Sequence, residues 1–141
     1  MTPKDRATKA SAALWAEDYA AQWLGINVIS VDEAQASLEL VVAKHHCNGH
    51  GICHGGIIFA LADTAFAYAC NSRNQSTVAQ HNTINFIAPA QLGDQLTATA
   101  SEISLTGRSG IYDVRVSNQD GKTIAEMRGM SRSIKGQLFA E

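Results

Sequence analysis

One stretch of the sequence, residues 55–71, limits what this chain can fold into more than any other. It predicts a helix with apolar side chains on nearly every face: Ile57, Ile58, Phe59, Leu61, Ala62, Ala65, Phe66 and Ala69. A helix without a polar stripe has to be buried on all sides. The rest of the chain must therefore wrap around it.

Strand-like segments precede and follow this helix. They combine alternating or β-branched patterns with turn residues such as Pro89, Gly93, Asp94 and Gly121 between them. The predicted strands are residues 26–31, 36–42, 76–87, 95–105, 109–117 and 122–134. The first two and the last two are each expected to form a β-hairpin.

A second helix is predicted near the start of the chain, at residues 7–24. Leu14, Trp15, Tyr19 and Trp23 recur there at steps of three and four residues, which is typical of an amphipathic helix. Gly25 is a plausible end for it, because glycine readily adopts the backbone conformation that terminates helices.

This order of elements predicts an α+β fold in which one antiparallel sheet curls around the apolar helix. The chain has 141 residues, the size of a common single domain, and no repeat or linker divides it. We therefore expect one domain over residues 1–141. Because one helix cannot cover a wide sheet and its edges, we also expect self-association.

Composition and charge exclude several classes of protein. No run of apolar residues approaches the ~20 needed to span a membrane, and the first 13 residues lack the apolar core of a secretory signal. A net charge of -2 argues against a surface built for nucleic acid. Three cysteines without a C-x-x-C pair suit reduced thiols. The expectation is a cytoplasmic protein with no disulfide and no membrane or nucleic-acid partner.

Asp63 is the first candidate for chemistry. It lies in the middle of the apolar helix, where an ionised carboxylate loses its hydration. The alternative is a buried structural aspartate that bonds to backbone groups or pairs with a cation. The residues upstream favour a functional role.

A pair of glycines, Gly55 and Gly56, opens the same helix. Their N–H groups have no partner within the helix, so they could polarise a carbonyl and hold an oxyanion, although ordinary turn formation explains many Gly-Gly pairs. Asp63 follows Gly55 by eight residues, which places the two roughly 12 Å apart along one helix. A site that uses both must therefore combine Gly55 of one subunit with Asp63 of another.

The loop before the helix supplies further candidates. Asn48 could hydrogen-bond an attacking water or a substrate carbonyl, or simply form a turn. His54 could cap the helix or contact the ligand. The loop also holds six potential metal ligands in ten residues, but their spacing matches no usual zinc site, so no metal is predicted.

Three cations in the second half of the chain, Arg108, Arg132 and Lys135, could bind phosphate groups. Each could equally be a solvated surface residue. Arg108, next to Gly107 at a strand turn, is the one that we include in the predicted site.

These residues together resemble the signature of the PaaI-type acyl-CoA thioesterases, a branch of the hot-dog superfamily. The resemblance rests on Asn48-x-x-Gly51-x-x-His54-Gly55-Gly56, followed by Phe59, Leu61 and Asp63. It continues through residues 62–71, Pro89, residues 93–100 and the closing hairpin. Nearly the whole chain, from about Ala13 to Ile134, is covered.

The resemblance implies a hot-dog fold and a homodimer with a continuous sheet, often paired into a dimer of dimers. It implies hydrolysis of acyl-CoA without a metal or other cofactor, with phenylacetyl-CoA or its ring-hydroxylated derivatives as substrate. Asp63 would be the catalytic carboxylate, the Gly55 amide would polarise the thioester, and Asn48 would place water. We expect His54, Gly56 and Arg108 to contact the substrate.

The sequence departs from the family in the strand after the helix. Some relatives have a serine or threonine there, where His81 and Asn82 stand in this chain, so we expect a different acyl pocket. Two other functions share parts of the pattern. One is a non-catalytic acyl-CoA sensor, which normally needs an output element that the first 25 residues do not supply, and the other is an enoyl-CoA hydratase, which usually pairs a histidine with the carboxylate.

Overall fold

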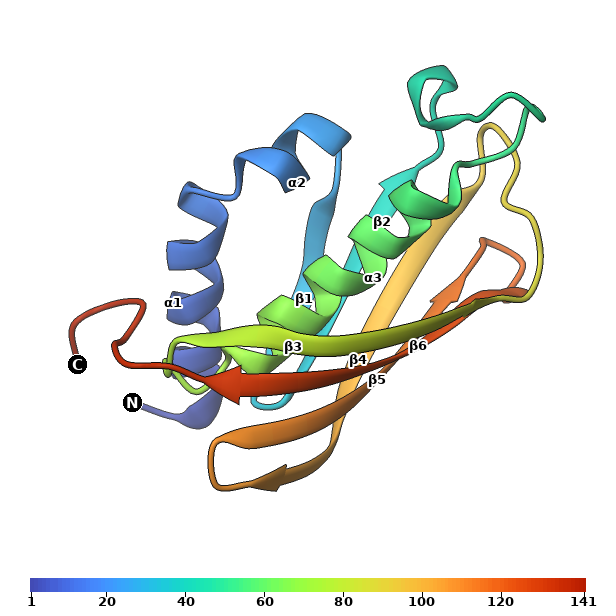
Figure 1. Cartoon of the computed structure of the whole chain (residues 1–141). Helices are drawn as coiled ribbons and strands as arrows, with labels where there is room; N and C mark the ends of the chain where they lie inside the picture. Colours follow the sequence, from blue (N-terminus) through green and yellow to red (C-terminus); the bar gives the residue numbers. More distant parts are fainter.

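The central feature of the fold is a curved antiparallel sheet that wraps around one helix (Figure 1). The computed structural model describes residues 1–141. Its six strands follow the order β1-β2-β4-β5-β6-β3 across the sheet. The elements are α1 Pro3–Ala16, α2 Tyr19–Leu24, β1 Asn27–Asp32, β2 Gln35–Val41, η1 Lys44–His46, α3 Gly55–Cys70, β3 Thr77–Phe86, β4 Gln95–Thr106, β5 Ser109–Ser117 and β6 Thr123–Ser133.

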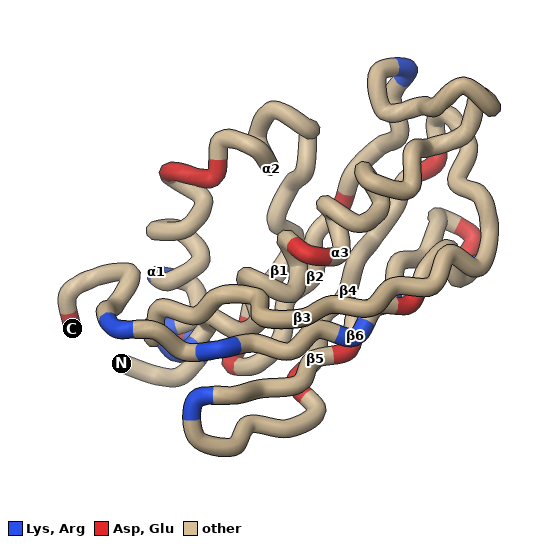
Figure 2. The backbone as a smooth tube through the Cα atoms, in the orientation of Figure 1, with Lys and Arg blue, Asp and Glu red and all other residues tan.

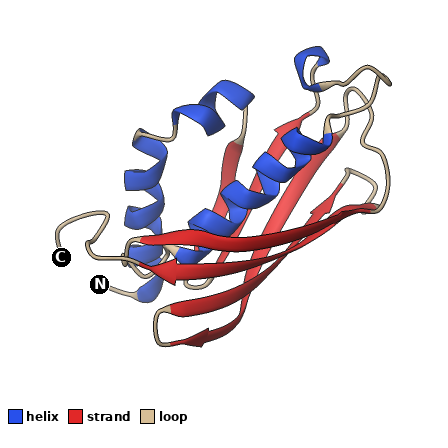
Figure 3. Ribbon diagram, viewed as in Figure 1, coloured by secondary structure: helices blue, strands red, loops and turns tan.

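Helix α3 is the buried helix that the apolar stretch predicts. His54 caps its first turn and Asn71 ends it. Leu61 and Phe66 are completely buried, and Phe66 packs against Tyr112 of β5 with ring centroids 5.4 Å apart. Burying each such side chain contributes about 1.5–3 kcal/mol. Figure 3 shows the strands as one curved layer with α3 lying across it.

The sheet follows the two-residue period that the sequence predicts. On β5, for example, Tyr112, Val114 and Val116 are buried against the helix, while the residues between them are more exposed. The outer face carries ion pairs such as Arg128 with Asp113, 2.7 Å apart. Both predicted hairpins, β1 with β2 and β5 with β6, are confirmed.

The prediction of one N-terminal helix over residues 7–24 is wrong. The structure has two helices, α1 and α2, because Asp18 interrupts the first and caps the second by accepting a hydrogen bond from Ala21 N. The apolar periodicity also misleads, since Tyr19 is 71% and Trp23 80% exposed. Gly25 does end the segment, in the left-handed conformation at φ 83°.

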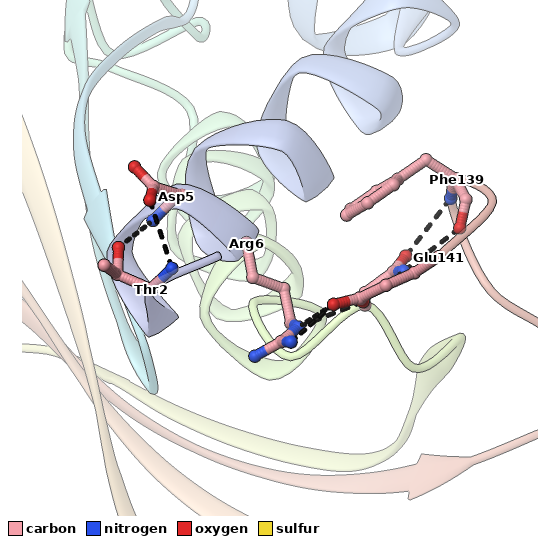
Figure 4. Close-up of polar contacts among 6 residues, drawn as sticks. Thr2, Asp5, Arg6, Phe139 and Glu141 are labelled. Carbon is pink, nitrogen blue, oxygen red and sulfur yellow. Dashed lines mark hydrogen bonds and ion pairs between the residues drawn. The ribbon is translucent and has the colours of Figure 1, made fainter.

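Helix α1 begins earlier than predicted because polar contacts fix its first turn (Figure 4). Thr2 and Asp5 form a capping box, in which each side chain accepts from the other's backbone N–H at 3.0 and 3.1 Å. Arg6 forms an ion pair with Glu141 at the other end of the chain. This pair ties α1 to the C-terminal segment beside β3.

Strand β3 is an edge of the sheet. It pairs with β6 on one side and with no strand of this chain on the other, and its Val78 and Phe86 are 47% and 53% exposed. The opposite edge, β1, lies beside α1. An unpaired edge is a surface on which another strand can add. No helix of the structure is long and apolar enough to cross a membrane.

Candidate active site

Asp63 is the only charged residue of α3, visible as the single red segment on that helix in Figure 2. It lies half-buried where α3 faces β3. The side-chain amide of Asn82 on β3 donates a hydrogen bond to Asp63 Oδ1 at 2.9 Å. Burial raises the pKa of the Asp63 carboxyl above its ordinary value, and the hydrogen bond from Asn82 acts in the opposite direction. The result is a poorly hydrated carboxylate with one donor.

A groove lies at the N-terminus of α3, with a volume of about 460 Å³. Its lining is mostly apolar: Asn48, Ile52, Cys53, Gly55, Ile58, Phe86, Ile87, Ala88 and Pro89. Gly55 N has no acceptor among the hydrogen bonds of the chain. A Cβ at Gly55 would lie 3.2 Å from the ring of Phe86, a close contact that glycine avoids where this amide borders the groove.

His54 is the N-cap of α3. Its Nδ1 accepts a hydrogen bond from Gly56 N at 3.0 Å, so a neutral His54 ring carries its proton on Nε2. This contact uses the Gly56 amide. Of the two glycine amides that open the helix, Gly55 is therefore the one free to meet a ligand.

The side chain of Asn48 both stabilises the loop before α3 and lines the groove. Its Oδ1 accepts hydrogen bonds from His50 N at 2.9 Å and from Ile52 N at 3.4 Å, which shapes the loop before α3. The same side chain lines the groove beside Gly55, and no hydrogen bond of the chain uses its Nδ2. The amide nitrogen is thus a free donor on a residue that lines the same groove as Gly55.

Asp63 is not brought to this groove within one chain. It is absent from the residues that line the groove, in agreement with the roughly 12 Å that eight helical residues span. Asn48, Gly55 and the capping residue His54 therefore form one group at the end of α3, and Asp63 with Asn82 forms a second group midway along it.

Comparison with known proteins assigns the family. Residues 50–125 match the Thioesterase superfamily. The chain is 46% identical over 129 residues to the acyl-coenzyme A thioesterase PaaI of Escherichia coli (strain K12), covering 92% of each protein. The chain belongs to the thioesterase superfamily.

Solved structures support the same assignment for this enzyme. The E. coli PaaI protein from the phenylacetic acid degradation operon superposes with a TM-score of 0.95 at 43% identity, covering 96% of this chain and 99% of that one. A mutant of the phenylacetic acid degradation protein PaaI from Thermus thermophilus gives 0.80 at 32% identity, covering 83% and 100%. The predicted hot-dog fold is confirmed, and the enzyme is an acyl-CoA thioesterase of the PaaI type.

The predicted phosphate-binding cation lies elsewhere in this thioesterase. Arg108, at the turn between β4 and β5, donates to the carbonyl oxygen of Ser133 at 3.1 and 3.3 Å. With Lys135 and Gln75 it borders a separate depression of about 440 Å³, beyond the C-terminal end of α3. Figure 1 shows the turn between β4 and β5 at the opposite end of the molecule from the start of α3. Within one subunit, Arg108 and Gly55 are therefore not neighbours.

The potential metal ligands of the loop do not converge on one point. His46 is buried and its ring contacts Ala43 N and Leu24 O at 2.9 and 2.7 Å. The three cysteines are unpaired thiols, and burial raises the pKa of Cys53 to about 11. No three His, Cys, Asp or Glu side chains are grouped as a metal site.

Asn82 is the neighbour of Asp63 that sequence reasoning missed. The sequence marked it only as a departure from the serine or threonine of some relatives. One signal was present: Asn82 is two residues from Ile84, so both side chains point to the same face of β3, and Ile84 packs against the core. A polar residue in phase with a core residue is a candidate for contact with the helix.

Proposed function

We propose that this enzyme hydrolyses phenylacetyl-CoA, or its ring-hydroxylated derivatives, to the free acid and coenzyme A in the cytoplasm. The observation that carries the proposal is the single half-buried carboxylate of Asp63 on an otherwise apolar helix. The substrate class is supported by 46% identity to E. coli PaaI. An aromatic acyl group also suits the groove, whose walls include Phe86, Ile87 and Pro89.

The thioester carbonyl would bind at the head of α3. The open N–H of Gly55 donates to the carbonyl oxygen, and the positive end of the helix stabilises the negative charge that develops there. Asn48 Nδ2 donates to the attacking water or to the carbonyl. His54 and Gly56 support substrate binding indirectly, because the hydrogen bond between them shapes the first turn around the open Gly55 amide. Arg108 is assigned to binding the substrate from another subunit, since it is remote from Gly55 within one chain.

The partner subunit's Asp63 completes this site. It acts either as a general base on water or as a nucleophile that forms an anhydride, and in both routes the C–S bond breaks and coenzyme A leaves as the thiol. A single turnover in ¹⁸O-labelled water tests for the anhydride, because label enters the carboxylate of Asp63 only when water attacks the Asp63 carbonyl of that anhydride. No metal or other cofactor takes part.

The unpaired edge of β3 supports the dimer that this mechanism needs. Two β3 strands pairing across a twofold axis would join two sheets into one and bring two α3 helices close together. Two such dimers would form the tetramer. The dimer, not the single chain, is then the catalytic unit.

A thiol-release screen tests the proposed function. Phenylacetyl-CoA and hydroxyphenylacetyl-CoA are expected to give the highest kcat/KM, with benzoyl-CoA and straight-chain acyl-CoAs lower. Preference for straight-chain substrates would contradict the aromatic assignment. Tight binding without thiol release from any substrate would instead indicate a sensor.

A further inference from the structure

The carboxylate of Asp63 has one hydrogen-bond donor in the chain, the side-chain amide of Asn82. The Nδ2 to Oδ1 distance is 2.9 Å, and no other hydrogen bond reaches this carboxylate. The two residues come from different elements, α3 and β3. Any displacement of β3 relative to the helix would therefore change the direction in which Asp63 points.

The side chain of Asn82 occupies a space beside β6 that is open because the residue opposite it has no side chain. Its cross-strand partner on β6 is Gly129. A Cβ at Gly129 would lie 2.9 Å from Asn82 Oδ1 and 2.7 Å from the buried ring of Phe66. Real Cβ atoms essentially never approach so closely, so glycine at this position makes room for both side chains. The amide of Asn82 is thus confined between the helix and β6.

The other end of the same amide is unsatisfied. Asn82 Oδ1 is buried and has no hydrogen-bond donor, which is uncommon for a buried polar atom. Turning the amide over would leave the nitrogen unsatisfied instead and would place Oδ1 against the carboxylate oxygen, which is repulsive unless Asp63 is protonated. The orientation in the structure, with Nδ2 toward Asp63, is the one that suits an ionised carboxylate.

We propose that Asn82 is a positioning residue for the reaction, which holds Asp63 as an aimed, ionised carboxylate. The inference rests on the proposed function, in which Asp63 is the base or nucleophile. An asparagine kept only for stability would be expected to satisfy both ends of its amide. Here the end that faces the reacting group is bonded, and the end that faces the core is not.

The titration of Asp63 supports this role. Burial raises its pKa, and the hydrogen bond from Asn82 lowers it again, so Asn82 extends the range of pH in which the base form is present. The pKa of Cys70 on the same helix is raised to about 12, mainly by burial of its thiol and to a smaller extent by the charge of Asp63.

The other charged groups on elements that pack against α3 have partners of their own or face solvent. On β3, the only titratable residue is His81, which is exposed. The partnered groups are Asp18 with Tyr68, Glu39 with Gln95, Glu102 with Arg73 and Tyr112, Asp113 with Arg128, and Arg115 with Glu126. Asp32, Arg132 and the turn residue Arg108 lie at exposed positions. Asn82 is therefore the group that tunes Asp63 within the chain.

Two variants of Asn82 test the proposal in the full-length enzyme. Asn82→Ala removes the donor, so the acid limb of the kcat/KM profile should move to higher pH, with a loss of about tenfold on the acid side and a smaller loss at alkaline pH. Asn82→Asp keeps the shape but adds a like charge, so the limb should move further. Thr99→Ala is the control, because it also removes one strand side-chain hydrogen bond, to Ser37 on the outer face. Its profile should match the wild type.

A direct titration separates this inference from the proposed function. The Asp63 carboxyl is followed by ¹³C NMR without substrate, and its midpoint should rise in Asn82→Ala. A uniform loss of activity at all pH values, with an unchanged NMR midpoint, would overturn the positioning role while the thioesterase assignment stands. A wild type that releases no thiol would overturn the function, and the NMR titration would still decide the role of Asn82. If Asn82→Ala does not fold, Asn82→Leu, which removes the donor at a similar side-chain size without adding a charge, gives the same two readouts.

Discussion

At the scale of one residue, the ionised carboxylate of Asp63 is the form that the proposed reaction needs, but it is also the form that burial disfavours. Its pKa is raised in the folded protein, so the native state binds the proton more strongly than the unfolded chain does. Stability therefore falls as pH rises from the ordinary aspartate pKa through the raised value. Above that range the ionised group is less favourable to folding than the protonated one, which is consistent with the reacting role proposed for Asp63.

Asp63→Asn should remove both the activity and this destabilisation. We expect kcat to fall by about 10²- to 10⁴-fold, the usual contribution of a positioned base, and the thermal midpoint to rise at pH 7 but not at pH 3. Thermal unfolding at the two pH values and thiol release at pH 7 provide the measurements.

Asp113→Asn is the matched control for this prediction. On the outer face of the sheet, Arg128 lowers the pKa of Asp113, whereas burial raises the pKa of Asp63. This variant should keep its activity, and its stability at pH 7 should be unchanged or slightly lower. Near-native turnover in Asp63→Asn would contradict the catalytic assignment.

At the scale of elements, the first turn of α3 contributes a backbone N–H group, that of Gly55, to the proposed chemistry, and no side chain. His54 has φ −61° and ψ 134°, the extended conformation that a following proline accepts, and Gly55 is the first residue of the helix, where proline is well tolerated. Gly55→Pro can therefore delete the N–H group with little change to the helix.

Comparing Gly55→Pro with Gly55→Ala isolates the contribution of that N–H group. Both variants add the Cβ that approaches Phe86 to 3.2 Å, but only proline removes the donor. We expect kcat to fall about 10²- to 10³-fold in Gly55→Pro, the loss typical of one oxyanion donor, and much less in Gly55→Ala. Gly49→Ala, where a Cβ meets nothing within 4 Å, is a control for the loop. Equal losses in the alanine and proline variants would assign the effect to crowding.

The sequence predicted the elements whose signal is local. The helix at Gly55 was recognisable from a long run of residues that are apolar on nearly every face, and the strands from alternating or β-branched patterns between turn residues. The break at Asp18 was missed, since that periodicity continues across the residue although its side chain caps α2. The space for Asn82 could not be foreseen, because it depends on Gly129, which is 47 positions away and opposite only once the sheet has formed.

At the scale of the whole molecule, the chain alone leaves the two groups of the proposed site apart. The open amide of Gly55 borders the groove, while Asp63 does not. The sheet also ends at β3 with an unpaired edge. In the proposed dimer, pairing of two β3 edges would cover the unpaired edge and would also bring the second α3 helix near the first. Arg108, remote from Gly55 within one chain, would likewise have to act from another subunit.

Mixing two inactive variants tests whether the site is shared between subunits. Dimers of Asp63→Ala lack every carboxylate, and dimers of Gly55→Pro lack every amide donor. A mixed dimer contains one intact site if Gly55 and Asp63 come from different chains, so subunit exchange at equal amounts should restore about one quarter of the wild-type activity. A site within one chain would restore none. Mass spectrometry of differently tagged subunits must confirm that mixed dimers have formed, since without exchange neither arrangement could regain activity.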